Sequence, residues 1–376
     1  MADVPVPSKD FPRRKFPALN RLIASRGFQK WAARFPLTRR RVRREGEALF
    51  DLLAGFCHSQ VLMALVKLDV PQMLLEGPAT GRALATRTGV PDARMQVLLK
   101  AGIALGVLKA KRGGRFALTQ RGAALVGVPG LQEMIRHHDV LYRDLSDPVA
   151  FFRGETDSEL ARFWPYVFGG DVDPQVAATY SDLMAQSQLL VADDTLDAVS
   201  LKGVSHLMDI GGGTGAFLTE VGRRYEGLKL TLFDLPSVVP QAEAGFAQAG
   251  LSDRSWVKAG SFRSDVLPEG ADAISLVRVL YDHSDETVAA LLAKVYAALP
   301  EGGRLIISEP MSGGARPERA GDAYFAIYTL AMGTGKARSV EEITRLCRVA
   351  GFEDILTPRS RRPFITSCIV ARKRTG

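Results

Sequence analysis

Cysteines, metal-ligand spacings and long apolar runs are scarce in this sequence. Its 376 residues include three cysteines, Cys57, Cys347 and Cys368, which stand far apart. No C-x-x-C pair and no histidine spacing suited to zinc occurs, so neither a disulfide framework nor a metal site is expected, and a reducing cytoplasm fits best. Neither a run of about 18 apolar residues nor a secretory h-region is present, so we expect the chain neither to span a membrane nor to be exported. With 46% hydrophobic residues, the chain is long enough for two ordinary domains.

The net positive charge comes entirely from an N-terminal extension, residues 1–46. This stretch holds 13 Lys and Arg against three acids, a net charge of +10, whereas the remaining residues come to −2. Apolar residues recur between the basic ones at helical spacing: Leu19, Leu22, Ile23, Phe28, Trp31, Ala32 and Phe35. A basic amphipathic segment suits an anionic lipid surface, with its aromatic rings at the headgroup level. A helix packed on its own protein or on a dimer partner is the alternative, and nucleic acid is not the expected partner.

Residues 47–130 have the pattern of a winged helix. Two short helices, the second beginning after Pro91, precede two apolar segments that flank Gly113-Gly114, the expected turn of a two-residue hairpin. Such modules often bind DNA, but the helix after Pro91 carries only two cations, few for a recognition helix that meets phosphates. Residues 131–200 are mostly helical and are interpreted as a connector between two modules.

The most informative motif is HLMDIGGGTGAFLTEV at residues 206–221, an apolar strand followed by a glycine turn and an amphipathic helix. Glycines are needed where a ligand approaches the backbone at a helix N-terminus. The same spacing fits a dinucleotide fingerprint, so the glycines alone do not separate NAD from other nucleoside cofactors. Asp209 would be poorly placed beside a pyrophosphate but could meet the cationic amino group of S-adenosylmethionine. A second strand ends at Asp234, which can accept hydrogen bonds from both ribose hydroxyls; an exposed loop acid or helix cap is the alternative.

Further motifs follow in the same α/β region. They are FDLPSVV (233–239), Gly260-Ser261-Phe262, VRVLYDHSDE (277–286) and LPEGGRLIISEPM (299–311). Together with DIGGGTG (209–215), they make about residues 47–374 resemble the class I S-adenosylmethionine-dependent O-methyltransferases, which include caffeate-type and acetylserotonin enzymes. The resemblance implies a doubly wound, mostly parallel α/β sheet in residues 201–376 behind a winged-helix dimerisation domain. Within this group the chain is most similar to bacterial carotenoid O-methyltransferases, which act on a tertiary hydroxyl of an acyclic carotenoid.

The resemblance also implies S-adenosylmethionine as cofactor and a set of site residues. The cofactor contacts are Asp209, Gly211, Gly212, Gly213, Asp234, Leu235, Gly260, Ser261, Phe262 and Arg278. The substrate contacts are Tyr180, Met184, Tyr328 and Met332, and no metal is implied. The catalytic candidates are His283, Tyr281, Asp282 and Glu309.

Three positions depart from the family pattern. Tyr281 replaces the histidine base, Ser261 replaces an aspartate at the adenine end, and Ala337 replaces a glutamate that braces the base. His283 could serve as the base, oriented by Asp282 or Glu309. Alternatively, Tyr281 only positions the hydroxyl, or methyl transfer has been lost, as in relatives that hydroxylate or decarboxylate.

The nearby histidines also have structural interpretations. His283 could belong only to the cap of the helix that Ser284 begins. His137 and His138 are expected on a solvated helix face, although the connector contributes to the substrate wall in relatives.

The expected activity is O-methylation of a carotenoid hydroxyl in carotenoid biosynthesis of a photosynthetic cell. A long apolar substrate stays in the bilayer, which explains a basic amphipathic extension better than a small phenol does. We therefore expect a homodimer in the cytoplasm, peripheral on the inner or photosynthetic membrane. A soluble methyltransferase for phenols or quinones and a winged-helix DNA-binding regulator that senses the adenosyl cofactor are the alternatives.

Overall fold

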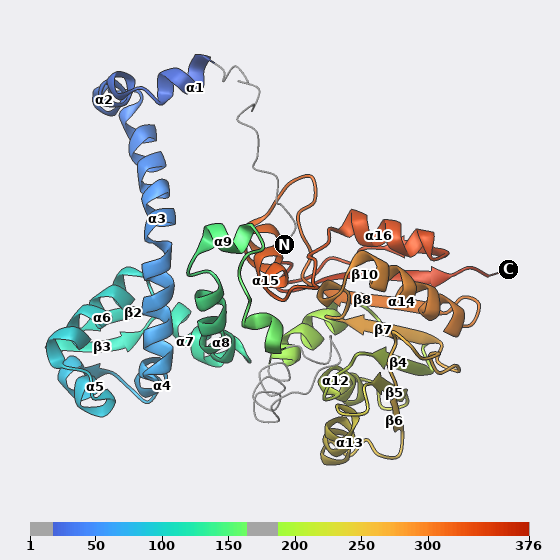
Figure 1. Cartoon of the computed structure of the whole chain (residues 1–376). Helices are drawn as coiled ribbons and strands as arrows, with labels where there is room; N and C mark the ends of the chain where they lie inside the picture. Colours follow the sequence, from blue (N-terminus) through green and yellow to red (C-terminus); the bar gives the residue numbers. More distant parts are fainter. Residues whose placement is uncertain (1–17, 164–186, 376) are drawn as a thin grey trace.

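The computed structural model describes residues 18–163 and 187–375. Two units are visible in Figure 1, a mainly helical N-terminal unit and an α/β unit that contains all seven strands of the larger sheet. The predicted residues Tyr180 and Met184 lie outside the described residues.

Three helices at the N-terminus form an arm. They are α1 (Ala18–Ile23), α2 (Arg26–Arg34) and α3 (Arg39–Lys67). Ser25 begins α2 by accepting a hydrogen bond from the Phe28 N–H at 3.3 Å, as N-cap residues do. Figure 1 shows that the first half of α3 projects from the body of the protein and carries α1 and α2 at its far end.

Helix α3 bears on the expectation that the chain does not span a membrane. By length and composition alone this 29-residue helix could cross a bilayer. The apolar side chains of its projecting half are exposed: Leu49, Phe50, Leu52, Leu53 and Phe56. However, Asp51 and His58 lie within the apolar stretch, and the last turns of α3 are buried in the helical unit at Met63, Leu65 and Val66. Exposed apolar surfaces of this kind mark contacts with another protein or with a membrane.

The helical unit has a small sheet of order β1-β3-β2 beside its helices. Its elements are α4 (Val70–Leu75), β1 (Ala79–Thr80), α5 (Gly81–Thr88), α6 (Asp92–Ala104), β2 (Leu108–Lys111), η1 (Arg112–Gly114), β3 (Arg115–Leu118) and α7 (Gln120–Gly127). Lys111 pairs with Arg115 across the hairpin. The turn is therefore the three-residue η1, not the predicted Gly113-Gly114 pair, although both glycines have positive φ angles of 70° and 64°.

Helical segments connect the two units. They are α8 (Leu131–Asp144), α9 (Pro148–Phe152), η2 (Leu160–Phe163) and, after the undescribed stretch, residues 187–198. Helix α8 contacts α3 and α7 on one side and α15 (Ala326–Ala331) of the α/β unit on the other. This position makes α8 the bridge between the units.

The large sheet has the order β6-β5-β4-β7-β8-β10-β9. Its strands are β4 (His206–Ile210), β5 (Lys229–Asp234), β6 (Ser255–Ala259), β7 (Ala273–Val277), β8 (Arg304–Glu309), β9 (Phe352–Leu356) and β10 (Ser367–Lys373). The strands from β6 to β8 in this order are parallel, whereas β10 is antiparallel to β8 and β9. This arrangement confirms the predicted doubly wound, mostly parallel sheet.

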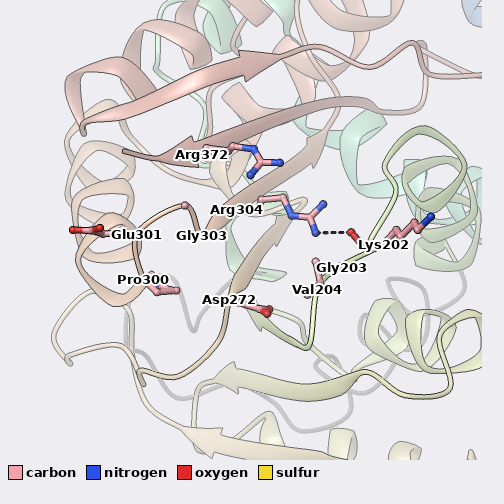
Figure 2. A pocket seen from close by; sticks show the side chains of 10 residues that line it. Lys202, Gly203, Val204, Asp272, Pro300, Glu301, Gly303, Arg304 and Arg372 are labelled. Atoms are coloured by element: carbon pink, nitrogen blue, oxygen red, sulfur yellow. Dashed lines mark hydrogen bonds between the residues drawn. The ribbon is translucent and has the colours of Figure 1, made fainter. Parts of the chain in front are cut away.

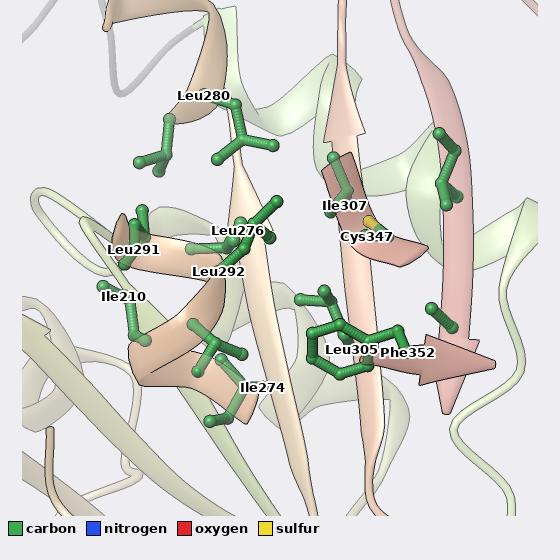
Figure 3. Packing of buried hydrophobic residues seen from close by; sticks show 14 of the residues in the cluster. Ile210, Ile274, Leu276, Leu280, Leu291, Leu292, Leu305, Ile307, Cys347 and Phe352 are labelled. Atoms are coloured by element: carbon green, nitrogen blue, oxygen red, sulfur yellow. The ribbon is translucent and has the colours of Figure 1, made fainter. Parts of the chain in front are cut away.

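Helices cover both faces of this sheet. They are α12 (Ala216–Arg224) and α13 (Val239–Gln248) over one core, and α14 (Asp285–Ala298) and α16 (Val340–Val349) over the other. Strand β7 reads AISLV and is buried at every position, as expected of a parallel strand covered on both faces. Figure 3 shows the second core, where residues of β7 and β8 pack against α14, Cys347 and Phe352. This packing fixes the carboxyl ends of β4, β7 and β8, where the candidate site lies.

Candidate active site

The glycine turn after β4 leaves room at the backbone for a ligand. Gly211, Gly213 and Gly215 have positive φ angles of 71°, 58° and 78°, which other residues adopt only with strain. At Gly212, a Cβ atom would stand 2.5 Å from the Asp209 carboxylate. Larger residues would therefore distort the turn that leads into α12.

Asp209 is a buried carboxylate with one oxygen unused. The Ser275 hydroxyl donates to Oδ1 at 2.6 Å, whereas Oδ2 has no hydrogen-bond partner in the described part of the chain. Burial raises the pKa of Asp209 to about 7, and the nearby Asp234 adds to the rise. A cationic group near Oδ2 would stabilise the ionised form, which is what an amino group of a bound cofactor would do.

Asp234 connects the end of β5 to the glycine turn. Its Oδ2 accepts from the Gly213 N–H and its Oδ1 from the Leu235 N–H, each at 2.7 Å. Burial raises the pKa of Asp234, and these two N–H donors partly offset that effect. Each oxygen keeps a further lone pair, so the carboxylate can still accept hydrogen bonds from a ligand diol.

The third predicted cofactor segment follows β6. A Cβ atom at Gly260 would come within 2.7 Å of the Phe233 ring, so the chain passes close to β5 here. The Ser261 N–H donates to Asp265 Oδ2 at 2.8 Å, which folds the segment into a turn. The ring of Phe262 lies edge-on to His283, with centroids 5.2 Å apart.

His283 therefore lies beside the predicted cofactor segment. Its Nδ1 accepts from Arg263 Nη2 at 3.3 Å, and only 7% of the residue is exposed. Burial, assisted by the charges of Arg263 and Arg338, lowers the pKa of His283 to about 4. The imidazole is neutral at physiological pH. The adjacent Ser284 caps α14 through the Thr287 N–H.

Arg278 and Tyr281 occupy the end of β7. Arg278 has a φ of 58°, a conformation that costs a non-glycine residue energy and often marks a functional position. Its guanidinium donates to the Tyr281 hydroxyl at 3.2 Å and to the Ser187 hydroxyl at 2.8 Å. Burial raises the pKa of Tyr281, so the phenol keeps its proton at physiological pH.

Two carboxylates flank Tyr281, the half-buried Asp282 and the fully buried Glu309. Asp282 has a pKa well above its ordinary value because of burial, and Arg278 partly offsets the rise. Burial likewise raises the pKa of Glu309 to about 7. Glu309 Oε2 accepts from the Tyr281 N–H at 3.1 Å, so Glu309 fixes the backbone at this point. Asp282 Oδ1 and Glu309 Oε1 have no hydrogen-bond partner among the described residues.

Tyr328 and Met332, both predicted substrate contacts, are buried in a wall that they form with residues of α8, α9 and η2. His137 and His138 of α8 reach this wall, contrary to the expected solvated face. Their Nε2 atoms lie 3.0 Å from the Tyr328 hydroxyl and 2.7 Å from the Tyr324 hydroxyl, respectively.

Sequence reasoning missed Arg338, a fully buried cation. Its guanidinium donates to the carbonyl oxygens of Leu280 at 2.8 Å and His283 at 2.7 Å, and to Asp285 Oδ1 at 2.7 Å. These bonds hold the segment that carries Tyr281, Asp282 and His283. The only sequence signal for Arg338 was its position directly after Ala337, which departs from the family pattern.

A polar hollow at the other end of the sheet is a separate feature. It is lined by residues that precede β4, β7 and β8, together with Arg304 and Arg372, and Arg304 Nη2 donates to the Lys202 carbonyl at 2.9 Å (Figure 2). Ligands of open α/β sheets bind at the carboxyl ends of the strands, so this hollow at the opposite ends is not the candidate site.

Among the described residues, no group of three His, Cys, Asp or Glu side chains could hold a metal ion.

Comparisons with known proteins agree with this geometry. An O-methyltransferase domain family matches residues 142–353, and an O-methyltransferase dimerisation domain family matches residues 50–127. Demethylspheroidene O-methyltransferase of Cereibacter sphaeroides is 58% identical over 353 residues, 93% of each chain. The protein of the same name from Rhodobacter capsulatus is 52% identical over 94% of this chain and 88% of its own length. The crystal structure of human N-acetylserotonin methyltransferase in complex with SAM has a TM-score of 0.72 and 27% identity, covering 88% of this chain and 98% of that one.

Proposed function

The chain belongs to the O-methyltransferase family, and we propose that it methylates the tertiary 1-hydroxyl of an acyclic carotenoid in carotenoid biosynthesis. The similarity to two demethylspheroidene O-methyltransferases, along nearly their whole length, is the observation that carries this proposal. The glycine turn after β4 and the acids Asp209 and Asp234 are the features of the site that match the family.

S-adenosylmethionine fits the cofactor site through residues of three strand ends. The unpartnered oxygen of Asp209 would accept from the cationic amino group, and Asp234 would accept from the ribose hydroxyls. Gly260, Ser261 and Phe262 would border the adenine. When bound, this cofactor supplies a methyl group on a positively charged sulfur that leaves as a neutral thioether.

Tyr281 and Asp282 are the proposed proton acceptors. An aliphatic alcohol has a pKa near that of water, about 15.7, so its proton must leave as the new C–O bond forms. We propose that the substrate hydroxyl donates to the Tyr281 oxygen while the phenolic proton moves to the Asp282 carboxylate, whose ionised, accepting form is favoured by the charge of Arg278 and by its hydrogen bond with the Tyr281 side chain. Arg278 orients Tyr281 by its 3.2 Å hydrogen bond, and Glu309 anchors the Tyr281 N–H.

His283 receives a different role in this proposal. Its Nδ1 accepts a hydrogen bond from Arg263, and its ring packs edge-on against that of Phe262. These contacts support a place beside the cofactor and weigh against the initial hypothesis that His283 takes the proton.

The substrate is tested by incubating the protein with labelled S-adenosylmethionine and a panel of hydroxylated acyclic carotenoids, quinones and phenols. We expect label in the ether product of a carotenoid with a tertiary hydroxyl. A carotenoid whose hydroxyl has been removed serves as the control and should stay unlabelled. Label found only in a phenol or quinone would overturn the carotenoid assignment.

We further propose that the protein acts as a homodimer in the cytoplasm, with its arm on the surface of the inner or photosynthetic membrane. Large apolar residues of α1 and α2 are exposed, among them Leu19, Leu22 and Trp31, and the Trp31 ring stacks on that of Phe35 with centroids 4.8 Å apart. Exposed arginines of α2 and the start of α3 border these side chains. Aromatic rings at headgroup level and cations beside them are the combination that holds a helix on anionic lipid. The exposed stretch of α3 would then pair with the second copy.

Deleting residues 1–46 is expected to abolish co-sedimentation with anionic vesicles and to leave the affinity for S-adenosylhomocysteine unchanged. Trp31→Ala in the full chain should weaken vesicle binding roughly tenfold, since the lost interfacial contact is on the order of 1.4 kcal/mol. Trp256→Ala is the matched control, because Trp31 and Trp256 are similarly exposed, at 51% and 44%.

Unchanged vesicle binding by the deleted chain would contradict the membrane proposal. Loss of the dimer on deletion, measured by analytical ultracentrifugation, would assign the arm to the second copy instead.

A further inference from the structure

Two histidines of α8 bridge the helical connector and the α/β unit. His137 pairs with Tyr328, and His138 pairs with Tyr324, across 191 and 186 positions of sequence. All four side chains are at least partly buried. Two adjacent residues of one helix therefore hold two hydroxyls of the segment formed by η4 (Gly321–Phe325) and α15.

Tyr328, more than Tyr324, is associated with Tyr281 and Asp282, the proposed reaction centre. The charges of Tyr281 and Asp282 act on the pKa of Tyr328, which burial raises well above its ordinary value. The pKa of Tyr324 is also raised by burial, and Arg278 acts on the pKa of both tyrosines. The geometry associates Tyr328 with Tyr281, because a Cβ atom at Gly335 would stand 2.7 Å from the Tyr281 carbonyl oxygen and 2.8 Å from the Cβ atom of Thr329, the residue after Tyr328.

A π-helical turn places both tyrosines. The turn η4 (Gly321–Phe325) runs directly into α15, so Tyr324 and Tyr328 fall on neighbouring turns, with ring centroids 6.2 Å apart. Gly321 permits this path, because a Cβ atom there would stand 2.3 Å from the Met311 carbonyl oxygen. Turns of this kind are rare and occur frequently at functional sites.

We infer that His137 is a positioning residue for methyl transfer, acting through Tyr328. In its Nε2–H tautomer His137 donates to the Tyr328 oxygen, which leaves the phenolic proton to bind the substrate oxygen. The substrate hydroxyl is then held between Tyr328 as donor and Tyr281 as acceptor, with a lone pair left for attack on the methyl carbon. This inference rests on the proposed function. Burial and His138 lower the pKa of His137 to about 4, in agreement with a neutral ring in this role.

The test is a double-mutant cycle on kcat and KM. We expect His137→Leu and Tyr328→Phe each to lower kcat about 30-fold, less than the 10²-fold or more typical of a directly acting base. The double variant should be no slower than Tyr328→Phe alone, because His137 acts through that hydroxyl. His137→Gln keeps an N–H donor and should recover most of the rate. Affinity for S-adenosylhomocysteine and the thermal unfolding midpoint should not change.

His138→Leu is the matched comparison and should lower kcat clearly less than His137→Leu does, because it leaves the His137–Tyr328 pair in place. Additive effects in the cycle would overturn the inference. So would an equal loss in His138→Leu, which would mean that both pairs only hold the wall together.

The double-mutant cycle is measured with whichever substrate the wild-type protein methylates in the labelling panel. If that substrate is not a carotenoid, the carotenoid assignment fails but the role of His137 is still tested. Absence of label on every acceptor would overturn both proposals.

Discussion

Tyr281→Phe is expected to lower kcat by on the order of 100- to 1,000-fold at saturating substrate and cofactor, the range typical of a lost acid–base group. The substitution removes only the hydroxyl that accepts the substrate proton and passes its own to Asp282. Because the ring remains, packing at the end of β7 and the Glu309 contact to the backbone should persist. Single-turnover rates with labelled S-adenosylmethionine measure the chemical step directly.

His283→Ala is the companion variant. Its contacts with Phe262 and Arg263 predict weaker cofactor binding and a kcat within about threefold of wild type once cofactor saturates. The opposite pattern, with His283→Ala slow and Tyr281→Phe at full rate, would identify His283 as the residue that accepts the substrate proton.

Arg338→Met is expected to lower the free energy of unfolding by about 2 to 5 kcal/mol, since the buried His283 carbonyl oxygen loses its donor and the Leu280 carbonyl oxygen keeps only the His283 N–H. Those oxygens belong to Leu280 and His283, on either side of the proposed acceptor pair. The loss of stability should therefore come with a loss of activity. Urea denaturation monitored by circular dichroism measures the free energy of unfolding, and the labelled-cofactor assay measures the activity.

Lys336→Met serves as the comparison for Arg338→Met. Lys336 also pairs with Asp285, but its side chain is 44% exposed whereas that of Arg338 is fully buried. An exposed pair contributes about 0 to 1 kcal/mol. Equal destabilisation by the two variants would show that the ion pair with Asp285, and not the buried carbonyl contacts, is what Arg338 supplies.

Features that depend on short stretches of chain could be predicted from the sequence. The glycine turn follows β4, Asp209 and Asp234 lie at the ends of β4 and β5, and a parallel sheet brings such strand ends together. The fold class was confirmed for the same reason, because β4 to β8 and their helices alternate with clear apolar periodicity. The hairpin turn was misplaced by one residue, since a loop length depends on cross-strand register and not on the glycines alone.

Side chains that meet across long sequence separations could not be predicted. His137 lies 191 positions from Tyr328, and nothing in the pattern around RHHD marks it as different from a solvated helix face. Arginines are mostly exposed, so the complete burial of Arg338 depends on carbonyl groups that only the folded chain brings to it. The environment of His283 likewise depends on Arg263, 20 positions away.

The projecting half of α3 has a thermodynamic consequence. Five large apolar side chains between Leu49 and Phe56 are exposed on one copy, and the matching dimerisation family begins at residue 50. When two copies cover these side chains, folding and association become a single equilibrium. The free energy of unfolding then includes the logarithm of protein concentration, so the level of expression itself sets how resistant each molecule is to denaturation.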